Sequence, residues 1–261
     1  MDWLTTATRD PHGPTLAWQT LSYPKGLLHT TEGSSWPDYG GWTMTPHGTA
    51  LPIPGVGIQA RQHIPYTQAA AGLMHTGDPE TNRLGVIQWE LIGTCDPSMR
   101  GQLYYWPEAD DAVLADLYRK VIAPTSTALG IPLTALTFEA YPASAGADNG
   151  VRLSGPAWVT YTGWLGHQHV PENDHGDPGA FPWARMLQAA GGDMPLSDTD
   201  LANIAKTVET YFQVHVGKGL ETRDQALGDE IALTQQLSAK VDALAQTVAA
   251  IAAKVGATTH P

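Results

Sequence analysis

Short apolar runs alternate with turn segments across residues 21–95, a pattern typical of β-strands. In KGLLHTTEG, Leu27 and Leu28 indicate the end of a short buried strand, and residues 30–33 read as the polar turn after it. In IQWELIG, from Ile87 to Gly93, alternate residues would point to opposite faces of a strand. The pattern therefore predicts a sheet in the first part of the chain.

Later segments predict a helix and a last strand. From Asp110 the apolar residues recur three and four positions apart, which predicts a helix that ends at Pro124. The run from Trp158 to Leu165 is rich in aromatic and β-branched residues and predicts a strand. Residues 1–20 contain prolines and a glycine, so an irregular N-terminal arm is expected. Residues 1–190 are therefore predicted to form an α/β domain, a mixed central sheet with packed helices.

The pattern changes after residue 190. Residues 191–218 predict a linker and a short amphipathic helix. Within residues 219–261, apolar positions alternate four and three apart between Leu237 and Val255, with Val at a and Leu or Ile at d. This C-terminal coiled-coil seam favours a homo-oligomer through residues 237–255, a parallel dimer over a trimer or tetramer. A single helix folded back on the first domain fits the same stripe.

Composition and charge restrict the classes of function. The chain has 261 residues, 42% of them hydrophobic and 15% charged, enough for one substantial core and an appendage. Its net charge of −12, with only 14 Lys and Arg, disfavours nucleic-acid binding, which needs clustered cations. No apolar run is long enough for a membrane span, and the N-terminus lacks a secretory pattern, so accumulation in the cytoplasm is expected. The single cysteine, Cys95, excludes an intrachain disulfide.

The loop from Gly166 to Trp183, GHQHVPENDHGDPGAFPW, contains three histidines and three acidic residues. A catalytic zinc needs three nitrogen, oxygen or sulfur ligands and one open position. His167 and Asp177 from this loop, with His29 from the strand end, form such a set, and that arrangement would be a hydrolase. A hydrogen-bonded structural role suits His29 by residue type as well. His169 lies in the same loop and is the alternative to His167 as a ligand, but it is expected to pack there or to support a ligand.

Several separated segments follow the order of one family's motifs. GLLHTTEG matches an apolar strand that ends in His and small polar residues, IQWELIG matches Ile-x-x-Glu-Leu-x-Gly, and Gly166–Trp183 matches Gly-His, a Pro loop and Asp-Pro-Gly. LMHTG around His75 is a weaker match. Over about residues 20–185 the chain resembles the zinc-dependent N-acetylmuramoyl-L-alanine amidases of the type-2 amidase and peptidoglycan-recognition-protein superfamily, in their phage endolysin form. The spacing from His167 to Asp177 is that of the bacterial anhydro-muropeptide amidases.

The resemblance implies a role for each site residue. His29, His167 and Asp177 would bind Zn²⁺, and Glu90 would take a proton from the attacking water and pass it to the leaving amine. Apolar neighbours on its strand should raise the pKa of Glu90, although a solvated glutamate on an edge strand is the alternative. Many relatives have Lys at the position of His175. A histidine there polarises the scissile carbonyl only if it is protonated or donates a hydrogen bond.

The resemblance also implies a peptidoglycan-recognition-protein-like fold and a peptidoglycan hydrolase. The enzyme would cleave the amide between N-acetylmuramic acid and L-alanine, and it would reach the wall from the host cytoplasm with the help of a holin. Its partner would be bacterial peptidoglycan. Two other classes remain open: a non-catalytic peptidoglycan-binding protein on the same fold, and a zinc peptidase or esterase that acts on another bond.

A few residues outside the motifs are candidates for the walls of a substrate cleft. Tryptophan rings near the motifs could stack on sugars, but core packing is more typical of this residue type. Single histidines in turn-like or apolar settings are more often structural. The loop at residues 141–157 either shapes a cleft or only connects two elements. The residues in question are Trp36, Trp42, Trp89, His47 and His75.

Overall fold

The computed structural model describes residues 2–13, 20–73, 80–171 and 173–191. All of them belong to residues 1–195, the first of the two units into which the chain divides. The predicted short helix and coiled coil, the oligomer through residues 237–255 and the weaker motif match around His75 lie outside the described residues. They stay predictions.

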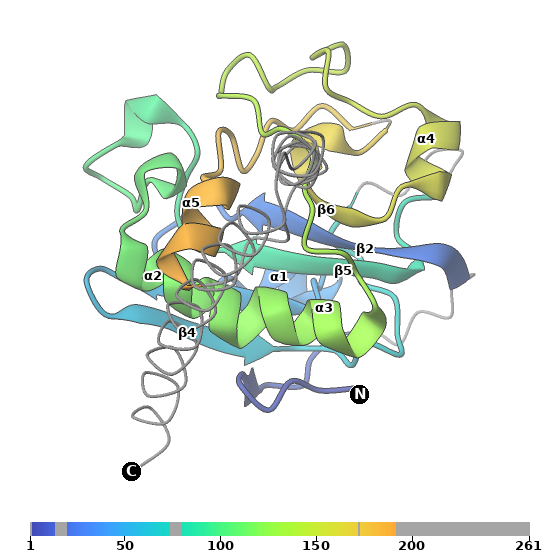
Figure 1. Ribbon diagram of the computed structural model, residues 1–261, viewed down its shortest axis with the longest axis horizontal. Coiled ribbons are helices and arrows are strands. Elements are labelled where there is room, and N and C mark those ends of the chain that lie inside the picture. Colours follow the sequence, from blue (N-terminus) through green and yellow to red (C-terminus); the bar gives the residue numbers. More distant parts are fainter. Residues whose placement is uncertain (1, 14–19, 74–79, 172, 192–261) are drawn as a thin grey trace, which may run out of the picture. The chain divides into compact units, whose positions relative to one another are not determined.

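One mixed sheet forms the centre of the described part, which confirms the predicted α/β class (Figure 1). The strand order is β1-β4-β3-β5-β2-β6, with β3 and β4 antiparallel and the other neighbours parallel. β5 and β2 are therefore central strands. The strands are β1 (Thr8–Arg9), β2 (Thr20–Thr30), β3 (Gly48–Ile53), β4 (Gly57–Gln62), β5 (Leu84–Leu91) and β6 (Gly163–Gly166).

Short helices pack around this sheet. In Figure 1, α2 and α3 run along one side of the sheet, with α5 beside α2 and α4 near β2 and β6. Single 3₁₀ turns occur at residues 97–99, 106–108 and 167–169. The α-helices are α1 (Tyr39–Trp42), α2 (Asp111–Leu117), α3 (Ala123–Leu129), α4 (Gly155–Thr160) and α5 (Trp183–Ala189).

The prediction that the helix ends at Pro124 is wrong. A π-helical turn, Tyr118–Ile122, joins α2 to α3, and the helical path continues to Leu129. Proline cannot donate a hydrogen bond to the carbonyl four residues earlier, which normally breaks a helix. Here the hydroxyl of Thr6 donates to that carbonyl, of Lys120, at 2.5 Å. The wider π turn and this outside donor let the helix pass the proline.

The predicted strand from Trp158 to Leu165 is wrong in its first half. Residues 155–160 form α4, and the preceding Ser154 caps it, because its hydroxyl accepts from the amide of Ala157 at 3.4 Å. β6 begins only at Gly163. The Ser-Gly-Pro start outweighs the β-branched residues because Trp158 reaches the core from a helix, where it is fully buried.

The N-terminal arm and the first predicted strand are also more ordered than expected. The arm contributes β1, which pairs with β4 and covers that edge of the sheet. The amide of Leu4 donates to the side chain of Gln62 at 2.7 Å, which ties the arm to the same strand. The strand expected to end at Leu27 and Leu28 continues through Thr30, so His29 lies inside β2.

Both faces of the sheet are buried. One face packs Leu28, Ile87 and Trp89 against α2, α3 and α5, and the other packs Leu27 and Val86 with residues of α4. The four tryptophans with no exposed surface, among them Trp89, belong to this interior, as the core-packing interpretation predicted: Trp89, Trp106, Trp158 and Trp164. Burial on two faces is typical of parallel strands in α/β proteins.

Lys25 is a cation inside the second apolar layer. It has no exposed surface, its Nζ donates to the carbonyl of Tyr23 at 2.9 Å, and it lies 5.1 Å from the ring centroid of Trp158. Burial, and next the charge of Arg83, lower the pKa of Lys25 to about 8. The folded protein therefore disfavours the charged lysine.

We expect Lys25→Met to raise the melting temperature at pH 7. The folded-state pKa of about 8 lies below the ordinary value of 10.5, so the penalty is complete below pH 8 and disappears as the pH rises to 10.5. The gain measured by thermal unfolding should shrink over that window. Lys120→Met is the control, because its partly exposed ammonium pairs with Asp116 at 2.7 Å and should give no gain. A lower melting temperature for Lys25→Met at pH 7 would contradict the prediction.

Candidate metal centre

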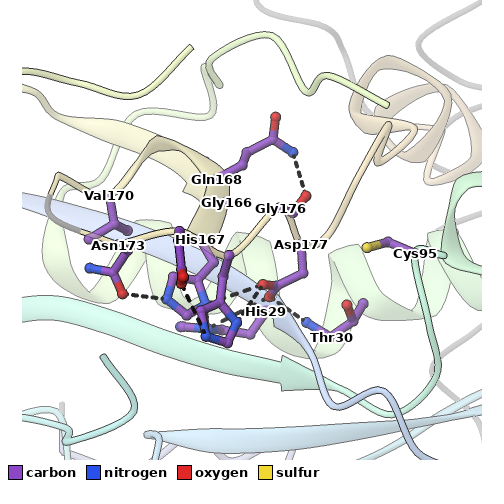
Figure 2. A network of polar contacts seen from close by, with 12 residues as sticks. His29, Thr30, Cys95, Gly166, His167, Gln168, Val170, Asn173, Gly176 and Asp177 are labelled. Atoms are coloured by element: carbon purple, nitrogen blue, oxygen red, sulfur yellow. Dashed lines mark hydrogen bonds and ion pairs between the residues drawn. The ribbon is translucent and has the colours of Figure 1, made fainter. Parts of the chain in front are cut away.

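The three predicted ligands lie together in the structure. His29 comes from the carboxyl end of β2, His167 directly follows β6, and Asp177 comes from the loop ten residues later. All three are buried, and one ligand atom from each lies within 4.8 Å of the other two. Figure 2 shows the three side chains pointing toward one another. A metal site brought together from distant segments was expected from the sequence, and the structure has a group able to hold a metal ion.

The geometry of the group fits a tetrahedral cation. His29 Nδ1 and His167 Nδ1 are 3.1 Å apart, and His167 Nδ1 is 3.2 Å from Asp177 Oδ1. Ligands at about 2.0–2.1 Å from a tetrahedral zinc are roughly 3.3 Å apart. If both ring nitrogens were unprotonated they would repel each other at this separation, and a shared cation would remove the repulsion. Nitrogen and oxygen donors of this kind suit zinc among several divalent metals.

The protonation states of His29 and Asp177 leave both side chains free to bind a metal. Burial, and next the neighbouring His167, lower the pKa of His29 well below its ordinary value, which keeps that ring neutral. Burial opposes the charge of Asp177. The nearby His167 and His29 and the amide of Thr30 nevertheless lower its pKa to about 2. Neutral imidazole and ionised carboxylate are the forms that coordinate a cation.

Hydrogen bonds from neighbouring groups orient two of the ligands. Nε2 of His167 donates to the side-chain oxygen of Asn173 at 2.8 Å, so in the neutral ring Nδ1 has no proton. Asn173 is held in turn by a bond to the carbonyl of Pro171 at 3.0 Å. The amide of Thr30 donates to Asp177 Oδ2 at 2.9 Å. Such partners set the tautomer and the direction of metal ligands.

Arg152 fastens the loop that carries two of the ligands. Its guanidinium donates to the carbonyls of Val170 at 2.7 Å, His175 at 3.2 Å and His167 at 3.4 Å, and to that of Gly146 at 2.8 Å. One side chain thus holds both ends of the ligand loop against residue 146. Neither Arg152 nor Asn173 was predicted from the sequence, because a side chain that bonds to distant backbone or side-chain partners has no local pattern.

Glu90 lies beside the three ligands, on the neighbouring strand. It is paired with His29 in the register of β5 and β2, and its Oε1 is 3.8 Å from His29 Nδ1. Its side chain is 13% exposed and its Oε2 is buried without a hydrogen-bond partner. Burial, and next the charges of Asp177 and Glu32, raise the pKa of Glu90 well above its ordinary value. The edge-strand alternative is wrong, because β5 lies between β3 and β2.

His175 lies at the mouth of the same site. Its side chain is 59% exposed, and its ring stacks on that of His167 with centroids 4.5 Å apart. Its Nδ1 is 3.7 Å from Asp177 Oδ1. This position places a ring nitrogen next to the metal ligands while leaving the ring open to a substrate.

Two further histidines of the described part, His169 and His47, make structural hydrogen bonds. Nδ1 of His169 accepts from the amide of Gly166 at 2.9 Å, and its Nε2 donates to the carbonyl of Thr137 at 2.9 Å, so neither nitrogen is free for a metal. This confirms the prediction for His169. His47 is likewise occupied, by the amide of Gln88 and the carbonyl of Gln68.

The site opens into two adjoining hollows. The smaller, of about 210 Å³, contains the ligands, Glu90 and Tyr39, and the larger, of about 710 Å³, extends past His175. They share Thr30, Thr31, His175 and Asp177. Tyr141 and Ala145 line the larger hollow, so the loop at residues 141–157 does shape a cleft. Tyr39 was not expected in the site from the sequence.

The described residues thus define an α/β protein with a buried His-His-Asp group at the carboxyl ends of parallel strands, where open α/β sheets commonly bind ligands. Comparisons with protein-family models, curated proteins and solved structures gave no match. In the described part of the chain no helix has the length and apolar character needed to cross a bilayer. Any assignment of function therefore rests on the site and its motifs.

We expect Asn173→Ala to weaken zinc binding about 10- to 100-fold while keeping one zinc per chain at saturation, because His167 loses the partner that fixes its tautomer. Competition with a chromophoric chelator measures the affinity. Gln102→Ala, which removes an exposed amide, is the control. Unchanged zinc affinity in a folded Asn173→Ala variant would show that this bond does not orient the ligand.

Proposed function

We propose that this protein is a zinc-dependent N-acetylmuramoyl-L-alanine amidase, a peptidoglycan hydrolase of the type-2 amidase and peptidoglycan-recognition-protein superfamily. The observation that carries the proposal is the meeting, in one hollow, of a His-His-Asp group with the buried carboxylate of Glu90, whose Oε2 has no hydrogen-bond partner. A binding module has no need to bury a carboxylate oxygen that lacks a partner, which costs free energy. A hydrolase needs this group as a proton acceptor.

His29, His167 and Asp177 would hold the zinc ion. When bound, zinc supplies Lewis acidity, which makes water a nucleophile near neutral pH and polarises a carbonyl. Glu90 would take a proton from the attacking water and deliver it to the amide nitrogen as the C–N bond breaks. The raised pKa of Glu90 supports the first step, because it makes the carboxylate a stronger proton acceptor than an ordinary glutamate. The protonated Glu90 can then deliver the proton to the leaving nitrogen.

His175 would bind the scissile carbonyl. Its exposed ring lies beside Asp177, and a hydrogen bond from one ring nitrogen to the carbonyl oxygen would stabilise the charge that develops there. A neutral imidazole donates from only one nitrogen, so this contribution depends on the tautomer in a way that a lysine would not.

The choice of peptidoglycan rests on the motifs and on the cleft. None of the described residues that line the two hollows is Lys or Arg, so the cleft does not select a polyanion. Its larger part combines hydroxyl, carboxylate and apolar groups, which suits a peptide stem. A phage endolysin made in the host cytoplasm and released to the wall through a holin accords with the motif resemblance.

Mass analysis of digested peptidoglycan tests the proposal. New L-alanine amino termini, formed with about one zinc per chain and lost on chelation, are the expected result. New D-amino termini or cross-bridge amines would instead identify a zinc peptidase. Binding to peptidoglycan without any new terminus would identify a non-catalytic module.

Two substitutions separate metal binding from chemistry. We expect His167→Ala to lose zinc and activity together, because it removes a ligand. Glu90→Gln should keep the zinc and lose activity about 100-fold or more, the usual scale for a general base. Glu108→Gln, a half-exposed glutamate paired with Arg100, is the matched control and should keep both. Zinc content and release of L-alanine termini are the measurements, and full activity of Glu90→Gln would remove the proton-transfer role.

A further inference from the structure

A chain of hydrogen bonds leads from the smaller hollow into the protein. Tyr39 lines this hollow with Glu90 and the metal ligands. Its hydroxyl is hydrogen-bonded to Thr49 Oγ1, and Thr49 Oγ1 is 2.8 Å from His63 Nε2. Nδ1 of His63 is 3.2 Å from the backbone carbonyl of Asp10. Thr49 and His63 are almost completely buried, so water does not replace these partners.

The sheet places the start of this chain next to the reactive groups. In the register of β2, β5 and β3, His29 lies opposite Glu90 and Glu90 lies opposite Thr49. Residues paired in this way share a face, so the three side chains form one row across the sheet. Tyr39 reaches this row from a turn in which it and the two glycines after it adopt positive φ angles, 48°, 65° and 67°.

The direction of each hydrogen bond in this series follows from its last acceptor, the carbonyl of Asp10. A backbone carbonyl only accepts, so Nδ1 of His63 carries the proton and donates to Asp10. Burial lowers the pKa of His63, so the ring is neutral and its Nε2 has no proton. Nε2 must then accept the hydroxyl proton of Thr49. Since that proton is used, the oxygen of Thr49 accepts the proton of Tyr39.

Tyr39 therefore has no proton left to donate into the hollow. Burial, and next the charge of Glu90, raise the pKa of its phenol, so it stays protonated and its one proton points to Thr49. The lone pairs of the phenol oxygen remain available on the side of the site. A substrate atom placed against Tyr39 must be a hydrogen-bond donor to gain from the contact.

We propose that Tyr39 accepts a hydrogen bond from the N–H of the scissile amide and so makes the site selective for amides over esters. The proposal rests on the proposed hydrolase function and adds a specificity-determining residue to it. An ester places an oxygen lone pair where the amide has its N–H, and two lone pairs facing each other repel. Sites built to pair a substrate N–H commonly reject analogues that lack it.

The test compares a zinc-loaded enzyme on two matched substrates, a muramyl pentapeptide and its analogue in which L-lactate replaces L-alanine at the scissile bond. For Tyr39→Phe we expect kcat/KM on the amide to fall about 10-fold, the scale of one lost hydrogen bond, while the value on the ester stays constant or rises. Tyr23→Phe, at an exposed tyrosine of β2, is the control and should change neither. An equal fall on both substrates, or no change on the amide, would overturn the proposal.

A second measurement tests the hydrogen-bond direction without turnover. The ¹⁵N chemical shifts of His63 should show a proton on Nδ1 and a bare Nε2. The opposite tautomer would reverse the chain, turn the proton of Tyr39 into the hollow and overturn the proposal. A wild-type enzyme that cleaves neither substrate, although His63 has the expected tautomer, would contradict the hydrolase function and, with it, the role of Tyr39 in amide selection. The hydrogen-bond direction at Tyr39 would still stand.

Discussion

The register of the parallel pairing around β2 is the constraint on which the site depends. β2 pairs with β5 on one side and with β6 on the other, so His29 lies opposite Glu90, and β6 ends at Gly166, next to His167. A slip of one residue would turn His29 to the opposite face of the sheet. The apolar layers on both faces prevent such a slip, because each would then have to bury the wrong side chains. Packing far from the site thus fixes the positions of its ligands.

The second constraint is the fixation of the loop that supplies Asp177. Its backbone carbonyls are paired with side chains from outside the loop, chiefly Arg152, and Ser144 donates to the carbonyl of Gly176 at 2.6 Å. A side chain at Gly176 would come within 3 Å of Ser144 and residue 145, so the close approach requires glycine. These contacts fix the position of a polar loop that has little regular secondary structure of its own.

Charged and polar side chains from the strands and from the loop lie together in one buried site. Two imidazoles and two carboxylates share a buried space in which His29 Nε2 and Glu90 Oε2 have no hydrogen-bond partner. Burial of unpaired polar atoms is unfavourable and is usual at sites that bind or react. The proposed amide selectivity has the same origin, because the buried Thr49–His63 pair fixes the proton of Tyr39 and leaves only lone pairs for a substrate.

The sequence by itself determined the α/β class, a strand that carries Glu90 and the residue types of the metal group, because these depend on local periodicity and on motifs with fixed spacing. Local pattern failed where distant partners decide the outcome: Thr6 donates to the carbonyl to which Pro124 cannot donate, and a burial site for Trp158 favours a helix over a strand. Tyr39, Asn173 and Arg152 could not be found in advance. Their roles arise from hydrogen bonds to residues that only the tertiary structure brings near, and no periodicity along the chain records such contacts.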